Sequence, residues 1–260
     1  MPYGICHLSV VPCRREPSDK SEMVTQLLFG DAFEVIETRD SWHHIVTSWD
    51  HYDCWIDRKQ YVPVSKSAFE NLKLNPAPVV TDLFQLITDT STGITFPIVI
   101  GSSLPFFSGN ECSIGERMYV VDGNAKPFET DISRESIVDT AMSFIHAPYL
   151  WGGRSPFGID CSGFTQAVFK VNGLQIKRDA YQQVEIGDAY SFVEEAQPGD
   201  LAFFDNEEGR IVHVGIVIGE NKIIHASGRV RIDHYDHYGI FTPERGGYTH
   251  NLRIIKNILP

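Results

Sequence analysis

The sequence predicts an α+β domain in its C-terminal half, preceded by two small all-β domains. Its 260 residues would suit about two average domains, and three small ones also fit. Short alternating runs rich in β-branched and aromatic residues fill the first part, and patterns of helical period begin only after Phe128. The predicted domain ranges are therefore 1–64, 65–127 and 128–260.

In the first range, five runs of strand character are separated by turn residues: ICHLSVV, TQLLF, FEVIET, HHIVTSW and YDCWID. Trp42 and Trp55 are expected to fill the interior of this small barrel. The second range contains ITFPIVIGSSLPFF and ERMYVVDGNAKPF, with Pro76 and Pro78 marking a linker before it. Both ranges are too short to carry catalytic chemistry alone.

The third range begins with two helices. In SRESIVDTAMSFIHAPYLWGG, helical spacing of apolar residues after a Ser133 N-cap predicts a helix of about 13 residues that ends before Pro148. DCSGFTQAVFKVNG predicts a second helix, with Cys161 in its first turn and Gly173 at its C-terminal end. Strands follow at DLAFF, IVHVGIVIG, KIIHASG and RIIKNIL, which predicts an antiparallel sheet after the helices.

The composition excludes several classes of protein. The hydrophobic fraction of 42% and the charged fraction of 22% are those of an ordinary globular chain. Because 22 basic and 34 acidic residues give a net charge of −12 without a basic cluster, we expect no nucleic-acid partner. No apolar run approaches the roughly 18 residues that predict a membrane span.

The N-terminal residues and the cysteines bear on the cellular compartment. No signal segment is visible, which predicts a cytoplasmic protein as the sequence stands, or a periplasmic or secreted one if a leader has been removed. The five cysteines include no C-x-x-C pair, so neither a disulfide framework nor a zinc site is indicated. We expect no cofactor, no metal and no obligate protein partner.

Cys161 is the predicted nucleophile, because a helix N-terminus and a nearby imidazolium both favour a thiolate. His213 and His225 are the histidines of this domain that lie inside convincing strands, whereas His234, His237 and His250 stand in polar loop sequence. The two strand histidines share a face only if their hairpin has an odd loop or a bulge near Gly215 or Gly219. His213 would then act as base and acid, and His225 would orient it. An ordinary core histidine is the competing interpretation for each.

These motifs resemble the NlpC/P60 family of cysteine peptidases. PYLWGGRSPFGIDCSGF, PGDLAFF, HVGIVIG and IIHAS occur in the order typical of that family, over about 130 residues from Asp131 to the end. The resemblance implies a permuted papain-like α+β fold. It also implies hydrolysis of γ-D-glutamyl–L-diamino acid bonds in peptidoglycan peptides.

The upstream regions resemble bacterial SH3-type (SH3b) barrels, 65–127 only weakly. In the subgroup with this domain order, the first barrel closes one end of the cleft and restricts substrates to small peptides with a free N-terminal L-Ala. The ammonium group of L-Ala, bound at the closed end of the cleft, needs hydrogen-bond acceptors from the protein. The resemblance assigns this role to Glu16 and Tyr52, with Asp179 as a third candidate and Glu22 as a competitor of Glu16.

Four further residues are candidates for substrate binding. Asp160 and Ser162 flank the nucleophile, and Tyr149 and Trp151 would line the oxyanion side or a pocket wall. Trp151 could equally be a core residue. Arg178 could bind the D-Glu α-carboxylate or pair with a carboxylate of the protein.

The sequence therefore predicts a cysteine endopeptidase that recycles murein peptides by releasing L-Ala-γ-D-Glu. The alternative is a hydrolase that remodels intact cell wall and uses its SH3b domains as wall-binding modules. A non-catalytic wall-peptide binder and an acyl transferase are further rivals. The sequence leaves open whether the diamino acid is lysine or diaminopimelate, and which oligomer forms.

Overall fold

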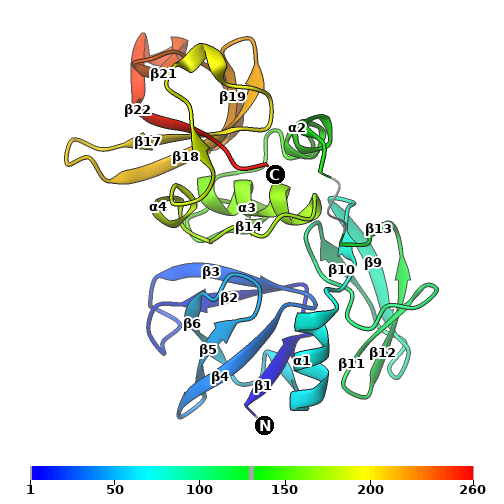
Figure 1. Cartoon of the computed structure of the whole chain (residues 1–260). Helices are drawn as coiled ribbons and strands as arrows, with labels where there is room; N and C mark the ends of the chain where they lie inside the picture. Colours follow the sequence, from blue (N-terminus) through cyan, green and yellow to red (C-terminus); the bar gives the residue numbers. More distant parts are fainter. Residues whose placement is uncertain (1, 129–131, 260) are drawn as a thin grey trace. The chain divides into compact units, whose positions relative to one another are not determined.

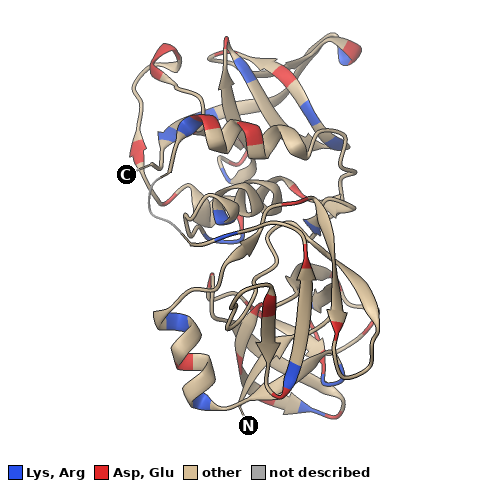
Figure 2. Ribbon diagram, turned by 90° about the vertical axis from the view of Figure 1, so that its right-hand side faces the viewer, with Lys and Arg blue, Asp and Glu red and all other residues tan. Residues whose placement is uncertain are grey.

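The computed structural model describes residues 2–128 and 132–259, which form two compact units. Unit 1 comprises Met1–Thr130 together with Trp151–Pro156, and unit 2 comprises Asp131–Leu150 and Phe157–Pro260. Acidic and basic residues are interspersed along the ribbon in both units (Figure 2). None of the helices in the described ranges is long and apolar enough to cross a bilayer.

Unit 1 begins with a seven-stranded sheet in the order β3-β2-β6-β5-β4-β1-β7 (Figure 1). The strands are β1 (Tyr3–Cys6), β2 (Val10–Arg14), β3 (Met23–Leu28), β4 (Ala32–Arg39), β5 (Trp42–Thr47), β6 (Asp53–Asp57) and β7 (Tyr61–Val64). The predicted run ICHLSVV is two strands, because the chain bends at residues 7–9 and its halves pair with different neighbours. β7 ends at Val64, which is why we propose this residue as the end of the first barrel.

The prediction that Trp42 and Trp55 fill the barrel interior is wrong. Aliphatic, cysteine and phenylalanine side chains form that core, among them Cys54 and Ile56 on either side of Trp55. Since successive side chains of a strand point to opposite faces, Trp55 faces outward. Its ring is buried there under the stacked ring of His44, 4.7 Å away, and Trp42 is half-buried.

The second part of unit 1 shares a core with the first. A helix that the sequence did not predict, α1 (Lys66–Leu74), begins at the N-cap Ser65, whose side chain accepts a hydrogen bond from the Ala68 N–H. The strands that follow are β8 (Val79–Val80), β9 (Phe84–Asp89), β10 (Thr95–Val99), β11 (Glu111–Ile114), β12 (Arg117–Asp122) and β13 (Ala125–Lys126). They form a four-stranded sheet, β10-β9-β12-β11, and the pair β13-β8.

One cluster of buried residues joins these strands to the first sheet, with Ile5 and Phe29 packed beside Ile87 and Tyr119. Gly30 allows this close contact. Its φ is +81°, and a Cβ there would lie 2.0 Å from the Ser103 carbonyl oxygen. The two halves of unit 1 therefore have a continuous hydrophobic core.

Unit 2 has the predicted order of helices first and antiparallel strands after. Its helices are α2 (Arg134–Ser143), α3 (Cys161–Val171) and α4 (Ala180–Gln183), with 3-10 turns η1 (Val193–Glu195) and η2 (Pro243–Arg245). Its strands are β15 (Gly158–Ile159), β16 (Asp188–Ala189), β17 (Leu201–Asp205), β18 (Ile211–Gly219), β19 (Lys222–Ser227), β20 (Arg229–Tyr235), β21 (Gly239–Thr242) and β22 (Gly247–Asn257). The short strand β14 (Arg154–Ser155) belongs to unit 1.

The large sheet of unit 2 has the order β16-β22-β17-β18-β19-β20-β21, and β22 also pairs with β21. Through this second pairing, β21 at one end of the sheet meets β22 near the other end. The sheet therefore curls around a core that includes Phe204, Val217, Ile240 and Ile255. Helix α3 lies against β18 and β19, and every one of its residues is buried. The predicted N-cap Ser133 and the predicted helix start at Cys161 are both confirmed.

Candidate active site

Cys161 is the first residue of the buried helix α3. Asp160 precedes it as the N-cap, and its carboxylate accepts a 2.6 Å hydrogen bond from the Gly163 N–H. The backbone N–H of Val214 hydrogen-bonds to the Cys161 thiol. Because Val214 follows His213 in β18, this contact brings the nucleophile to the strand that carries the predicted base.

Asp160 and Ser162 are bound to Arg178. The guanidinium group donates to both carboxylate oxygens of Asp160, at 3.0 and 2.6 Å, and to the Ser162 hydroxyl at 2.9 Å. Arg178 is 1% exposed, so it forms a buried, charge-assisted pair with the helix cap. Of the two roles predicted for Arg178, the structure shows the pairing within the protein.

A bulged hairpin places His213 and His225 on one face. Gly215 lies opposite His225 in the β18–β19 register, and the register shifts between Val217 and Gly219. This is the bulge that the shared face requires, and it makes the histidines diagonal neighbours. His213 Nε2 lies 2.8 Å from His225 Nδ1. Gly215 leaves room for the pair, since a Cβ there would lie 2.8 Å from the Cβ of His225.

Asp233 extends this chain and was missed from the sequence. Its Oδ2 lies 2.9 Å from His225 Nε2, and its Oδ1 accepts a 2.7 Å hydrogen bond from Arg231. Burial opposes ionisation of this carboxyl, but the bonds from His225 and Arg231 hold its pKa below the ordinary value. In the β19–β20 register His225 lies opposite Arg231, so Asp233 occupies the next position on the same face. Counting alternate residues across the Ser227–Gly228 turn could have placed Asp233 on the face of His225 from the sequence.

The carboxylate determines which nitrogen carries each proton. Because Asp233 can only accept, Nε2 of His225 is protonated, and Nδ1 of a neutral His225 accepts from His213 Nε2. The remaining lone pair of His213 is then on Nδ1. His213 is thus prepared to accept a proton from a thiol.

His250 is a second residue that the sequence analysis misplaced. It lies in β22, not in a loop, and its ring stacks on that of His213 at a centroid distance of 4.2 Å. Burial, followed by the charge of His225, lowers the pKa of His250 to about 4. The prediction that His234 lies in a loop is also wrong, because it belongs to β20. Both errors arise because polar residues alternate with apolar ones in strands with one exposed face.

Burial dominates the electrostatics of the reacting groups. It raises the pKa of the Cys161 thiol to about 12, with a further increase from Asp160 and an opposing effect of the Val214 N–H. Burial, and then the charges of His225 and His250, lower the pKa of His213 well below its usual range. Both shifts favour the uncharged forms, a thiol at Cys161 and a neutral imidazole at His213.

Tyr149 lies near the nucleophile, and Trp151 belongs to the other unit. The backbone of Tyr149 pairs with Ile159, two residues before Cys161, and burial followed by the charges of Cys161 and Asp160 raises the pKa of its phenol. Trp151 is 60% exposed in unit 1, where its indole N–H donates a 2.7 Å hydrogen bond to Glu22. Trp151 is therefore not a core residue.

The residues predicted to bind an ammonium group lie in both units. In unit 1, Glu16 is exposed beyond β2 and Tyr52 packs partly against the barrel core. The Glu22 carboxylate is bonded to both Arg15 and Trp151. In unit 2, Asp179 is half-buried at the start of α4. No group of metal-ligating side chains was found among residues 2–128 and 132–259.

Two family profiles match this chain. The first is the bacterial dipeptidyl-peptidase Sh3 domain, at residues 13–60. The second is the NlpC/P60 family, at residues 146–244, a range that contains Cys161, His213, His225 and Asp233. Residues 146–244 are an NlpC/P60 domain. These matches confirm the predicted resemblance to NlpC/P60 cysteine peptidases with an SH3 domain before the peptidase domain.

Relatives support this assignment. The chain is 43% identical over 115 residues to a Bacillus subtilis (strain 168) protein named Gamma-D-glutamyl-L-lysine dipeptidyl-peptidase, a match covering 43% of this chain and 38% of that one. It is 27% identical over 241 residues to Dipeptidyl-peptidase 6 of Lysinibacillus sphaericus, covering 82% and 83%. A crystal structure of an NlpC/P60 family protein from Bacillus cereus aligns with a TM-score of 0.84 at 21% identity over 99% of this chain and 100% of that one. This likeness shows the papain-like NlpC/P60 fold with an SH3 domain.

Proposed function

We propose that this chain hydrolyses the γ-D-glutamyl–L-diamino acid bond of murein peptides that have a free N-terminal L-Ala. The observation that carries the proposal is the buried hydrogen-bonded series of His213, His225 and Asp233, which begins on the strand whose Val214 N–H bonds to the Cys161 thiol. The names of the Bacillus subtilis and Lysinibacillus sphaericus relatives support the class of bond. Release of L-Ala-γ-D-Glu would make the reaction a step in the recycling of cell-wall peptides.

The geometry supports a two-step acyl transfer. His213 Nδ1 takes the thiol proton while Sγ attacks the γ-carbonyl carbon of D-Glu, which forms a tetrahedral intermediate. The C–N bond then breaks as His213 returns that proton to the leaving amine, which leaves a thioester on Cys161. Water attacks the thioester with His213 again acting as base, and the free thiol is restored.

Groups around the start of α3 would stabilise the charged intermediate. The Tyr149 phenol is close to the thiol, and the N-terminal end of α3 presents backbone N–H groups beside it. Because Arg178 holds Asp160 and Ser162, the helix start is kept in one conformation before substrate arrives. We propose that Asp160 and Ser162 contact substrate from this position.

We propose that Glu16, Tyr52 and Asp179 bind the free amine of L-Ala. Glu22 is the weaker choice, because Arg15 and Trp151 already bond to its carboxylate. Glu16 and Asp179 are carboxylates, and an ammonium ion is best held by charged acceptors. We also propose that the regions 1–64 and 65–127 are two SH3b-like barrels and that 128–260 is a permuted papain-like catalytic domain.

Incubation with defined substrates tests the proposal. The protein would be mixed with L-Ala-γ-D-Glu-L-Lys, with its N-acetylated form and with intact sacculi, and products followed by mass spectrometry with Cys161→Ala as the control. Cleavage of the free peptide alone supports a recycling peptidase. Cleavage of the acetylated peptide or of sacculi supports the alternative, a wall-remodelling hydrolase whose SH3 domain binds the wall. Cleavage of none would refute both.

A further inference from the structure

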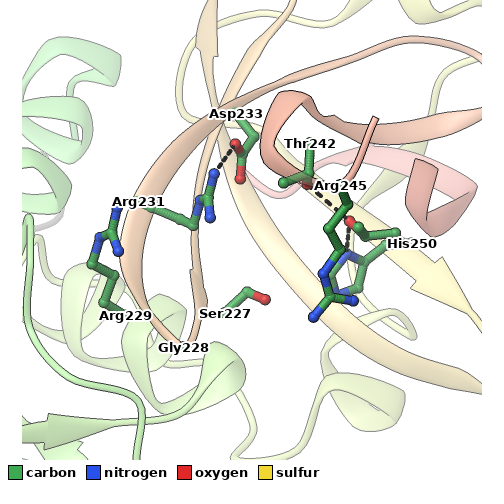
Figure 3. A pocket seen from close by; sticks show the side chains of 9 residues that line it. Ser227, Gly228, Arg229, Arg231, Asp233, Thr242, Arg245 and His250 are labelled. Carbon is green, nitrogen blue, oxygen red and sulfur yellow. Dashed lines mark hydrogen bonds and ion pairs between the residues drawn. The ribbon is translucent and has the colours of Figure 1, made fainter. Parts of the chain in front are cut away.

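A polar pocket of about 380 Å³ lies in unit 2 beside the histidine chain (Figure 3). Its volume is within the range of small-molecule sites. The pocket is lined by Ser227, Gly228, Arg229, Arg231, Asp233, Thr242, Arg245, Thr249 and His250. These residues come from β19, β20, β21, η2 and β22, together with the turn between β19 and β20. Figure 3 shows Arg245 and His250 on one side, Arg229 and Arg231 on the other, and Ser227 between them.

The pocket has an excess of positive charge in a chain whose net charge is −12. Arg231 is neutralised, because it bonds to Asp233 at 2.7 Å and to both carboxylate oxygens of Glu244 at 3.0 Å. Arg229 and Arg245 form no ion pair with any residue in the described ranges 2–128 and 132–259. Two guanidinium groups therefore remain available to an anionic ligand.

The same pocket shares a wall with the catalytic groups. Asp233 orients His225, and His250 stacks on the face of His213. The proposed mechanism has His213 return a proton to the amine that leaves. A pocket separated from His213 only by the stacked ring of His250 is therefore suited to the part of the substrate on the amine side of the scissile bond.

We propose that this pocket binds the carboxylate groups of the departing diamino acid, and that it favours diaminopimelate over lysine. The inference rests on the proposed function for the identity of the ligand. Diaminopimelate and lysine both carry a side-chain ammonium group, but only diaminopimelate has a second carboxylate, on the same carbon as that ammonium. Arg229 and Arg245 would pair with the two carboxylates of diaminopimelate, whereas lysine offers them one carboxylate and leaves its ammonium charge unbalanced beside them. The hydroxyl groups of Ser227, Thr242 and Thr249 supply additional hydrogen bonds.

Steady-state kinetics with matched tripeptides test the preference. L-Ala-γ-D-Glu-meso-diaminopimelate should have a kcat/KM about tenfold higher than L-Ala-γ-D-Glu-L-Lys, which corresponds to one good charge-assisted contact. Arg245→Gln and Arg229→Gln should each bring this ratio toward one. Arg210→Gln is the matched control, because Arg210 lies in the β17–β18 hairpin loop and pairs with the exposed Glu208. A ratio of one or below in the unmodified protein, or one that both pocket variants retain, overturns the proposal.

A binding measurement separates this inference from the proposed reaction. Calorimetric titration of free meso-diaminopimelate and of L-lysine into Cys161→Ala protein requires no turnover. We expect a dissociation constant of about 1 mM or lower for meso-diaminopimelate, with weaker binding in Arg245→Gln and unchanged binding in Arg210→Gln. If no tripeptide is cleaved but this pattern holds, the proposed function fails and the pocket stands. If peptides are cleaved but meso-diaminopimelate binds no better than lysine, the pocket proposal fails alone.

Discussion

The cysteines of the two units have similar environments and different neighbours. Cys6, Cys54 and Cys112 are buried in unit 1, and burial raises the pKa of each thiol, that of Cys112 to about 12. Cys161 in unit 2 is also buried, at 8% exposure, and its pKa is raised to about 12 as well. Burial and acidity therefore do not distinguish the nucleophile from the structural cysteines.

The distinction lies in what surrounds the sulfur. Cys112 packs among apolar residues of the unit 1 core, including Ile114 and Tyr119. Cys161 begins a helix and contacts the strand that carries His213, whose own pKa is lowered so that it is neutral and able to accept a proton. A buried thiol becomes a nucleophile when an oriented base is buried with it.

The largest expected effect separates these two kinds of cysteine. Cys161→Ala should lower kcat for γ-D-glutamyl peptides by a factor of about a thousand or more, because no other group can form the thioester. The Cys112→Ala protein should have the kcat of the unmodified protein. It should be less stable, because the substitution leaves a cavity in the core of unit 1. Turnover by purified Cys161→Ala protein would remove the assignment of the nucleophile.

A smaller effect is expected at the far end of the histidine chain. Asp233→Asn should lower kcat by a factor on the order of a hundred, because His225 would no longer be held in the tautomer that orients His213. The acid limb of the pH profile should shift at the same time, since the base would lose its oriented partner. Asp205→Asn, at the end of β17 with a long 3.9 Å ion pair to Arg253, is the matched control. An Asp233→Asn enzyme with the normal pH profile would show that Asp233 has only a structural role.

The amine site should affect KM more than kcat. Asp179→Ala and Glu16→Gln should each raise KM for L-Ala-γ-D-Glu-L-Lys by about tenfold, the contribution of one charged hydrogen bond, while kcat changes little. Glu22→Gln is the comparison variant, because its carboxylate is already bonded to Arg15 and Trp151. Equal effects of Glu16→Gln and Glu22→Gln would argue against Glu16 as the specific acceptor.

The smallest effect is a pH dependence of stability. The folded-state pKa of His250 is about 4, below its unfolded value of 6.5, so the unfolded chain binds more protons between these values. Stability should therefore fall as the pH drops from 6.5 toward 4. His250→Phe should reduce that fall by roughly 2–4 °C in Tm, as followed by thermal denaturation at pH 7 and pH 4.5. His234→Phe, at an exposed position in β20, is the control. An unchanged pH dependence of Tm in His250→Phe would show that His250 is not the source of the loss of stability at low pH.

Local patterns in the sequence were sufficient for helices α2 and α3 and for the position of Cys161 at the start of α3. Ser133 and Asp160 are N-caps whose side chains satisfy the first N–H groups of their helices, and this signal needs no tertiary contact. The parity argument for His213 and His225 was also local, because one bulge in a single hairpin decides it. Helix α1 was missed, and among its residues only Phe69 is buried.

What the sequence by itself determined is the order of the elements, the position of Cys161 at a helix start and the condition under which two strand histidines share a face. The tertiary structure alone decided that this condition is met and which distant residues lie beside the histidines and the helix cap. His250 reaches His213 because the sheet places β22 beside β17, and Arg178 comes to Asp160 from a segment beyond α3. Such contacts depend on which distant segments pack against each other. Hydrophobic periodicity and capping patterns are local, so they do not predict that packing.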